Sequence, residues 1–317
     1  MRLQRLALEV FNTPLLIEPS KLETIVKVME SAMSGEKMEQ FSDRERASAG
    51  YQVVNGVAVI DVSGSLVHKA SYLDAYSGLT GYDRLGDAFD MAMSDDSVSR
   101  VAMILDTPGG HASGAFDLSD RIYAARGVKP ITAVVSDMAY SAGYLIASAA
   151  DEVVVSRTAG VGSVGVVMAH TDVSKAAENE GVKVTYIYSG DHKVDGNPYT
   201  ALSDDVKARF QAETDKLYDL FVSTVARNRN MTTEEVIKTQ ALTYTGKAGI
   251  DAGFADRISA EHEELARLYS LSLGGSRQNI LTMKETTMSD ENLVGPTADE
   301  IQSQVKAAED AAFALGS

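Results

Sequence analysis

The sequence predicts an α/β fold in which a mainly parallel sheet is covered by helices on both faces. Between residues 51 and about 270, short runs of Val, Ile and Leu alternate with longer stretches of helical periodicity. Near-continuous apolar strands separated by helices are typical of parallel sheets that are buried on both sides. With 317 residues, 44% of them hydrophobic, the chain can build one large domain with extensions.

The expected elements follow one another in a regular order. Strands are expected at 56–64, 101–106, 130–136 and 152–156, and helices at 81–95, 113–126 and 141–150. A long helix is expected at 202–229, with Ser203 or Asp204 as its N-cap. Two further strand-like segments lie at 164–169 and 182–188.

The two ends of the chain differ in composition from this central region. Residues 1–50 predict an amphipathic helical arm, and residues 271–317 predict a polar linker followed by an acidic, alanine-rich helix. The expected division is therefore an arm at 1–50, a main domain at 51–270 and an extension at 271–317.

Composition excludes several classes of protein. The net charge of −16 argues against nucleic acid and anionic membranes as partners. The absence of cysteine excludes disulfides and cysteine-ligated metals, and no motif predicts a metal site or a cofactor. No signal peptide is evident, and no run approaches the roughly 18 apolar residues of a membrane-spanning helix. We therefore expect a soluble, intracellular protein without a membrane anchor.

One serine lies where a strand is expected to give way to a helix, in the stretch "SDMAYSAGYLIASAA". The plainest interpretation is that Ser141 is a helix N-cap. The alternative is a nucleophile on a tight turn, because a helix N-terminus and the N–H of Ala142 favour an oxyanion. Gly143 would then let a substrate backbone come close. The stretch does not fit the G-x-S-x-G pattern.

A second turn, "LDTPGG", follows the strand that ends at Asp106. The carboxyl ends of strands in open α/β sheets are where ligands bind. The backbone N–H of Gly110 would supply the second half of an oxyanion hole, with Gly109 shaping the turn. The alternative is an ordinary structural turn, in which glycine is common.

A serine nucleophile needs a base. Lys193, in "YSGDHKVDGNPYT", is one candidate, and it would need burial to lower its pKa from about 10.4. A Ser-His-Asp triad is also open, since the sequence contains five histidines, His68, His111, His170, His192 and His262. By local sequence alone, Lys193 and His192 look like solvated loop residues.

A glycine-rich turn, "TAGVGSVGVVMAH", contains G-x-G-x-x-G. It is not a dinucleotide fingerprint, because the third glycine leads into a strand-like segment rather than a helix. Ser163 in this turn is either structural or orients the base.

Four motifs, "TPGG", "YSAGYLIASAAD", "GVGSVGV" and "YSGDHKVDGNPY", resemble in order and spacing the signal peptide peptidase A family of serine–lysine peptidases. The resemblance covers about residues 50–260. It implies the Clp protease/crotonase superfold of repeated β-β-α units, usually as homo-oligomers. The roles that it implies are Ser141 as nucleophile, Lys193 as general base, Ser163 in contact with the lysine, Gly110 and Ala142 as oxyanion donors, and Gly109 and Gly143 beside the substrate.

The opening "VFNTPLLIEPSKLE" resembles the soluble members encoded by tailed bacteriophages, the prohead proteases. This implies cleavage of scaffold, portal or capsid protein, and of the protease itself, inside procapsids in the host cytoplasm. The C-terminal extension would then be scaffold-like. Three alternatives stay open: a bacterial cytoplasmic peptidase that degrades peptides, a crotonase-like acyl-CoA enzyme for which only Asp137 is an evident acid, and a non-enzymatic assembly factor.

Overall fold

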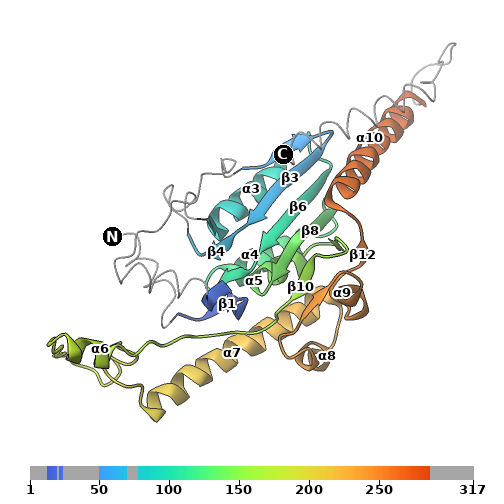
Figure 1. The fold of residues 1–317 in the computed structure, drawn as a ribbon. Coiled ribbons are helices and arrows are strands. Elements are labelled where there is room, and N and C mark those ends of the chain that lie inside the picture. The colour runs from blue at the N-terminus through green and yellow to red at the C-terminus, as the bar shows by residue number, and fades with distance from the viewer. Residues whose placement is uncertain (1–12, 20, 24–49, 70–77, 286–317) are drawn as a thin grey trace.

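The computed structural model shows a mixed α/β fold built on two sheets (Figure 1). It describes residues 13–19, 21–23, 50–69 and 78–285. The larger sheet has the strand order β11-β10-β8-β6-β3-β2, with β9 pairing β8 and β12 pairing β9. The smaller sheet has the order β1-β7-β4-β5.

The strands in chain order are β1 (Leu15–Ile17), β2 (Gln52–Val54), β3 (Val57–Ser63), β4 (Ser65–Val67), β5 (Leu79–Gly81), β6 (Arg100–Thr107), β7 (Gly109–His111), β8 (Ile131–Tyr140), β9 (Glu152–Val155), β10 (Gly160–Gly162), β11 (Thr243–Thr245) and β12 (Arg257–Ile258). The helices are α3 (Tyr82–Ser94), α4 (Ala115–Ala124), α5 (Ala142–Ser148), α6 (Ser174–Asn179), α7 (Asp204–Arg229), α8 (Thr233–Lys238), α9 (Lys247–Asp251) and α10 (Glu261–Glu285).

The larger sheet is covered on both faces, as the sequence predicted. Strands β3, β6 and β8 pair in parallel at its centre. Along β3, Ala58 and Ile60 belong to the main core with α3, α4 and α5. The alternate residue Val57 packs with Leu268 and Tyr269 of α10 on the other side. The period-2 alternation of a strand thus separates two apolar layers.

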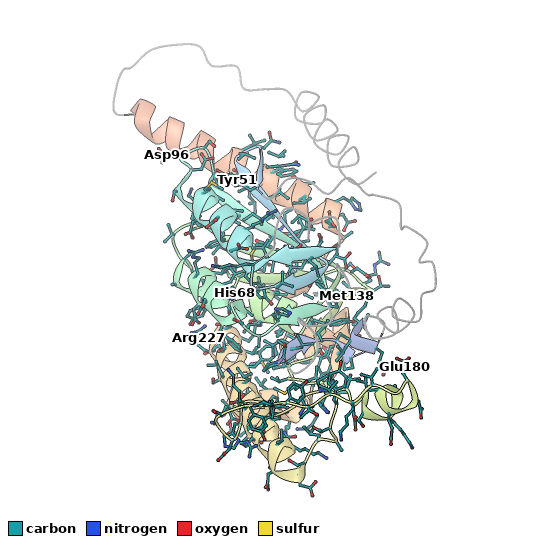
Figure 2. All side chains as sticks on the ribbon, turned by 90° about the vertical axis from the view of Figure 1, so that its left-hand side faces the viewer. Tyr51, His68, Asp96, Met138, Glu180 and Arg227 are labelled. Atoms are coloured by element: carbon teal, nitrogen blue, oxygen red, sulfur yellow. The ribbon has the colours of Figure 1, made fainter. Side chains whose placement is uncertain are left out.

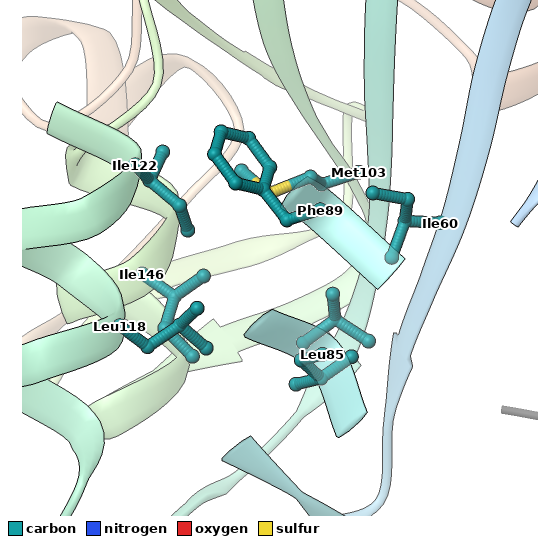
Figure 3. A pocket seen from close by; sticks show the side chains of 8 residues that line it. Ile60, Leu85, Phe89, Met103, Leu118, Ile122 and Ile146 are labelled. Carbon is teal, nitrogen blue, oxygen red and sulfur yellow. The ribbon is translucent and has the colours of Figure 1, made fainter. Parts of the chain in front are cut away.

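A small gap in the main core lies between these helices and the sheet (Figure 3). It is lined by Ile60, Val62, Leu85, Phe89, Met103, Leu118, Ile122 and Ile146. All of these side chains are apolar, so the gap is a feature of core packing and offers no polar group for chemistry.

Strand β8 is longer than the sequence predicted. Its first half, Ile131–Val135, pairs with β6 on one side and β9 on the other. Its last residues, Met138–Tyr140, pair with β10 in place of β9, while Ala139 still pairs with Thr107 of β6. We expected the strand to end near Ser136, but this change of partner carries it to the residue before Ser141.

Of the remaining predictions, the N-cap of the long helix is confirmed, but two expected strands are not formed. Ser203 is confirmed as the N-cap of α7, since its side chain accepts a hydrogen bond from the N–H of Val206 at 3.4 Å. The strand expected at 182–188 is wrong, because this segment is exposed and forms no ladder with the described strands. The segment 164–169 is also not a strand, although Val167 forms an isolated antiparallel bridge with Leu15.

Residues 171–203, here called the arm, extend away from the two sheets and return to the start of α7 (Figure 1). The arm contains α6, and Glu180, which follows that helix, lies at the edge of the molecule in the second view (Figure 2). The backbone N–H of Val173 bonds to the carbonyl of Pro198 at 2.7 Å, which closes the base of the arm.

The expected domain boundaries are only partly covered by the described residues. The N-terminal helical segment expected at 1–50 lies mostly outside them, but its residues 15–17 form the buried strand β1 rather than a helix. The boundary expected at 270 falls inside α10, which continues to Glu285. The expected helix beyond Pro296 lies outside the described residues. No helix in the described ranges is long and apolar enough to cross a membrane.

A partly buried ion pair beside the larger sheet gives the fold a pH-dependent contribution. Asp256 accepts hydrogen bonds from the Arg229 guanidinium at 2.8 and 3.0 Å and from the Val153 N–H at 2.7 Å. Partial burial raises the pKa of Asp256, but these bonds outweigh it and hold the pKa below its ordinary value. A carboxyl with a depressed folded pKa stabilises the fold above its unfolded pKa of about 3.9, and this contribution is lost as pH falls.

We therefore expect Asp256→Asn to lower the free energy of unfolding by about 1–2 kcal/mol at pH 7, discounted for the partial exposure of the pair. The difference from the unsubstituted chain should shrink below about pH 4. Urea titrations at pH 7 and pH 3.5 measure it. Asp251→Asn is the matched control, because its pair with Lys247 is exposed. Equal losses for the two variants at pH 7 would contradict the expectation.

Candidate active site

Ser141 lies buried between the end of β8 and the start of α5. Its backbone has φ 53° and ψ −114°, a strained conformation for a residue other than glycine. Two hydrogen bonds hold it there: its N–H donates to Gly162 O, and its carbonyl accepts from Leu145 N–H, both at 2.9 Å. Such strain at a strand-to-helix turn is typical of functional positions.

The side chain of Ser141 does not cap α5. No side-chain cap bond forms at this helix N-terminus, and the hydroxyl instead lies 3.5 Å from the carbonyl oxygen of Gly165. Ser141 therefore occupies the N-cap position, as predicted, but its side chain does not act as a cap. Its hydroxyl faces the space between β7 and residues 165–167.

Gly109 and Gly110 of β7 lie beside Ser141. Gly109 has φ +100°, and a Cβ at this position would lie 3.0 Å from the Cβ of Ser141. At Gly110 a Cβ would lie 1.8 Å from the carbonyl oxygen of Leu66. Both positions therefore require glycine, and their backbones form one wall of the space in front of the serine.

Thr107 fixes this wall, although no pattern in the sequence marks it as a site residue. Its hydroxyl donates to Gly64 O at 2.6 Å and accepts from the Gly109 N–H at 3.1 Å. A Cβ on Gly143 would lie 2.4 Å from the Thr107 methyl group, so Gly143 allows α5 to pack against β6. Ala142, the first residue of α5, is fully buried next to the serine.

Ser163 follows β10 as Ser141 follows β8. These two strand ends are neighbours, because Tyr140 pairs with Gly162. Ser163 is almost fully buried at φ +56°, and its N–H donates to Leu242 O at 3.0 Å. The structure thus brings Ser141, Ser163, Gly109 and Gly110 to one region.

The structure does not bring Lys193 to this region. Lys193 is exposed in a turn of the arm, where its N–H bonds to Gly190 O at 3.0 Å. Asp195 ties that turn to α7 through Arg209 at 2.5 Å and also contacts His192 at 3.1 Å. The hydrogen bond from Arg209 is the main reason that the pKa of Asp195 is lowered.

Two of the histidines that kept a triad open are engaged away from Ser141. His68 contacts the Ser113 hydroxyl at 3.1 Å, and His192 contacts Asp195 in the arm. His111 is buried in β7, next to Gly110. Among the described residues, no group of three or more His, Cys, Asp or Glu side chains could hold a metal ion.

An unexpected element, β1, lies beside the site. Strand β1 pairs antiparallel with β7, with Leu16 opposite Gly110. On its other side, Leu15 exchanges two backbone hydrogen bonds with Val167, at 2.9 and 3.0 Å. The only sequence signal for this strand was the short apolar run "PLLI" inside a region that we expected to be helical.

A strained, buried serine between a strand and a helix, beside the glycines of β7, is suited to acyl transfer. Comparison with known proteins agrees: residues 124–272 match the profile described as Peptidase family S49. This part of the chain is therefore similar to that peptidase family.

Two phage proteins are similar over most of the chain. Capsid assembly protease C of Escherichia phage lambda is 39% identical over 276 residues, which is 81% of this chain and 63% of the relative. Head-tail preconnector protein GP5 of Enterobacteria phage P21 is 37% identical over 267 residues, 78% of this chain and 53% of the relative. Protease 4 of Haemophilus influenzae is 24% identical over 223 residues, 70% of this chain and 35% of that protein. The chain thus spans between half and two thirds of the length of the two phage relatives.

Substitution of a glycine of β7 tests the geometry of the site directly. We expect Gly110→Ala to abolish peptide cleavage and to lower the melting temperature, because its new methyl group would meet the backbone of Leu66, which has no room to move. Gly274→Ala in α10 is the matched control. No atom lies within 4 Å of a Cβ built there, so that change should stabilise the helix by about 0.5–1 kcal/mol. Full activity in Gly110→Ala would contradict the described packing.

Proposed function

We propose that the chain is a serine endopeptidase of the Clp protease/crotonase superfold, with Ser141 as its nucleophile. Its substrates are scaffold, portal or capsid proteins of a bacteriophage, and it acts inside the procapsid. The observation that carries the proposal is the buried Ser141 at a strained turn between β8 and α5, beside the glycines of β7. The names of the two phage relatives, a capsid assembly protease and a head-tail preconnector protein, support the substrate class.

The proposed reaction has two steps. The Ser141 hydroxyl attacks the scissile carbonyl as its proton passes to a base, and the backbone N–H groups of Gly110 and Ala142 hold the oxyanion. Collapse of the tetrahedral intermediate breaks the C–N bond, and the amine leaves with that proton. Water then hydrolyses the acyl-enzyme, which returns the hydroxyl to Ser141.

The proposed base is Lys193, with Ser163 as a residue that positions it. An exposed lysine is protonated near neutral pH, so Lys193 must become desolvated before it can accept a proton. The arm that carries it exposes an apolar surface made of Val182, Val184, Tyr186, Ile187 and Tyr188. We therefore propose a homo-oligomer in which a second copy covers the arm, and in which Lys193 acts on the neighbour's Ser141.

Co-expression tests the proposed substrate class. The chain is produced together with the scaffold, portal and major capsid proteins of the phage that encodes it, and mass spectrometry maps the termini that appear. We expect discrete new termini in at least one of the three proteins. The same termini should be absent with Ser141→Ala. If all three proteins stay intact while short peptides are degraded, the chain is a peptide-degrading enzyme rather than a maturation protease.

A further inference from the structure

Strand β1 lies between two backbone segments, next to Ser141. On one side it pairs with β7, and on the other side Leu15 bonds to Val167 in the segment 165–167. The Ser141 hydroxyl faces Gly165 O of that segment. The three residues of β1 are almost completely buried in this space.

The register of β1 directs its backbone to the proposed oxyanion donor. The Ala112 N–H bonds to Pro14 O at 3.3 Å, and the Glu18 N–H bonds to Pro108 O at 2.9 Å. In an antiparallel ladder, hydrogen-bonded pairs occur at every second position. Leu16 and Gly110 stand midway between these two pairs, so the Gly110 N–H faces the carbonyl of Leu16.

The same carbonyl lies close to the serine. A Cβ built on Gly109 would be 2.1 Å from Leu16 O and 3.0 Å from the Cβ of Ser141. The Leu16 carbonyl and the Ser141 side chain therefore both lie next to Gly109 of β7. An extended substrate with its scissile carbonyl at Gly110 would need the space that β1 fills.

We propose that residues 14–18 are an internal occupant of the peptide-binding groove, which leaves before a substrate strand enters. This proposal rests on the proposed function of Ser141. Strand β1 is an edge strand of the smaller sheet, and its departure would expose the backbone of β7 for a new antiparallel strand. Pro14 and Pro19 bracket the segment, so its ladder cannot lengthen at either proline N.

The occupant also indicates which substrates fit. Leu16 is completely buried and belongs to the main apolar core. A substrate strand in the same register should therefore carry an aliphatic side chain at this position and adopt an extended conformation. Charged side chains there would enter the core without a partner.

A reversible crosslink tests whether β1 must leave. The chain contains no cysteine, so Leu15→Cys with Val167→Cys introduces the only thiols. Hydrogen-bonded antiparallel pairs have Cα atoms about 5.5 Å apart, within reach of a disulfide. We expect the oxidised variant to lose at least about 90% of its cleavage of an unfolded protein such as casein, and reduction to restore it. The single-cysteine variants and the unsubstituted chain should not respond to reductant. Equal cleavage by the verified oxidised and reduced forms would overturn the proposal.

A binding experiment gives an answer that does not depend on catalysis. In a Ser141→Ala background, Leu16→Asp should release β1, and the fluorescent peptide NTPLLIEP should then bind at least about tenfold more tightly than it binds with β1 intact, because the tethered strand no longer competes. The peptide NTPLDIEP is the matched control and should not bind. Leu265→Ala, which loosens the contact of α10 without touching the groove, should not increase binding.

The two experiments separate the two proposals. Peptide binding without any casein cleavage in the reduced variant or the unsubstituted chain would keep the groove and reject the proposed protease. No peptide binding to a Leu16→Asp variant that keeps the circular dichroism spectrum of the parent would reject the groove, whatever the cleavage activity.

Discussion

Mixing Ser141→Ala protein with Lys193→Ala protein should restore cleavage that neither variant shows alone. Each single variant should lose about 10³-fold or more in rate, and the double variant little beyond that, because the two residues act as one unit. In a mixed homo-oligomer, half of the serines and half of the neighbouring lysines are intact. If Lys193 acts on the neighbour, about a quarter of the sites are complete, which sets the expected recovery.

The structural basis for this expectation is the separation of the two residues within one chain. Ser141 is buried beside β7, whereas Lys193 is exposed in an arm that extends away from the sheets (Figure 1). His192→Ala is the control and should retain most activity. Dead single variants without recovery on mixing would show that both residues act within one chain. An active Lys193→Ala variant would reject the lysine as the base.

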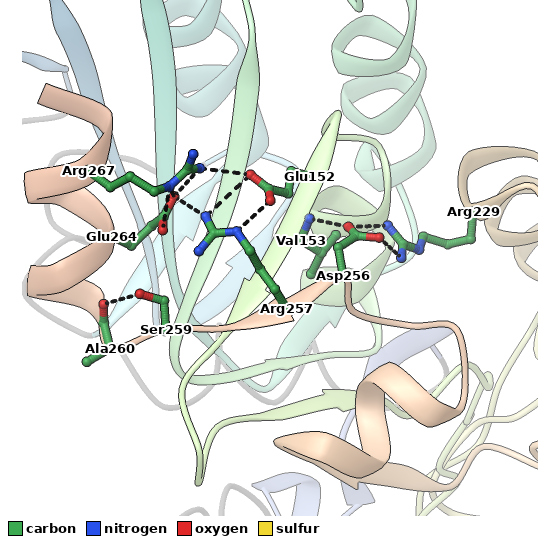
Figure 4. A network of polar contacts seen from close by, with 9 residues as sticks. All are labelled: Glu152, Val153, Arg229, Asp256, Arg257, Ser259, Ala260, Glu264 and Arg267. Carbon is green, nitrogen blue, oxygen red and sulfur yellow. Dashed lines mark hydrogen bonds and ion pairs between the residues drawn. The ribbon is translucent and has the colours of Figure 1, made fainter. Parts of the chain in front are cut away.

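Glu264→Ala should produce the largest loss of stability outside the active site. Glu264 is a fully buried residue of α10, where it accepts hydrogen bonds from Arg267 and contacts Arg257 (Figure 4). Both arginines also reach Glu152. Partial burial lowers the pKa of Arg257, but its bonds to the two glutamates outweigh this and raise the pKa above its ordinary value.

Removal of Glu264 would leave two guanidinium groups together, with only the half-exposed Glu152 to balance them. Breaking a buried ion pair from one side typically costs about 3–5 kcal/mol, and we expect a loss near the lower value because the arginines are partly exposed. Urea unfolding measures this loss. Limited proteolysis should also cut α10 faster, since the network joins that helix to β9 and β12.

Glu263→Ala is the matched control for this prediction. Glu263 is the neighbouring residue on the same helix but is exposed, so its removal should change the free energy of unfolding by less than about 0.5 kcal/mol. A Glu264→Ala variant as stable as this control would show that the network does not hold α10 against the sheet.

Local patterns in the sequence predicted the elements whose partners are their own neighbours along the chain. The apolar run at 56–64 corresponds to β3, and that at 101–106 corresponds to most of β6. The strand-to-helix turn that carries Ser141 was also predicted. The turn expected at Gly109 and Gly110 is instead the short strand β7, and the helix after it begins at Ala115. Both segments follow parallel strands, whose carboxyl ends share one edge of the sheet, so their proximity follows from the fold class.

Elements that depend on distant partners could not be predicted in this way. Strand β1 exists because residues 109–111 and Val167 flank it, and nothing in "PLLI" specifies those partners. Conversely, the alternating pattern at 182–188 fits a strand, but a strand forms only where a neighbouring strand accepts its hydrogen bonds. The burial of Thr107 against Gly143 likewise appears only when β6 and α5 are packed together.

Covalent labelling shows whether Ser141 is the nucleophile. The unsubstituted chain is incubated overnight with a fluorophosphonate, long enough for β1 to leave the groove, and tryptic peptides are analysed by mass spectrometry. We expect one adduct, on the peptide that contains Ser141, and no adduct in Ser141→Ala protein. An adduct on Ser163 or another serine, or a chain that cleaves protein without labelling at Ser141, would contradict it.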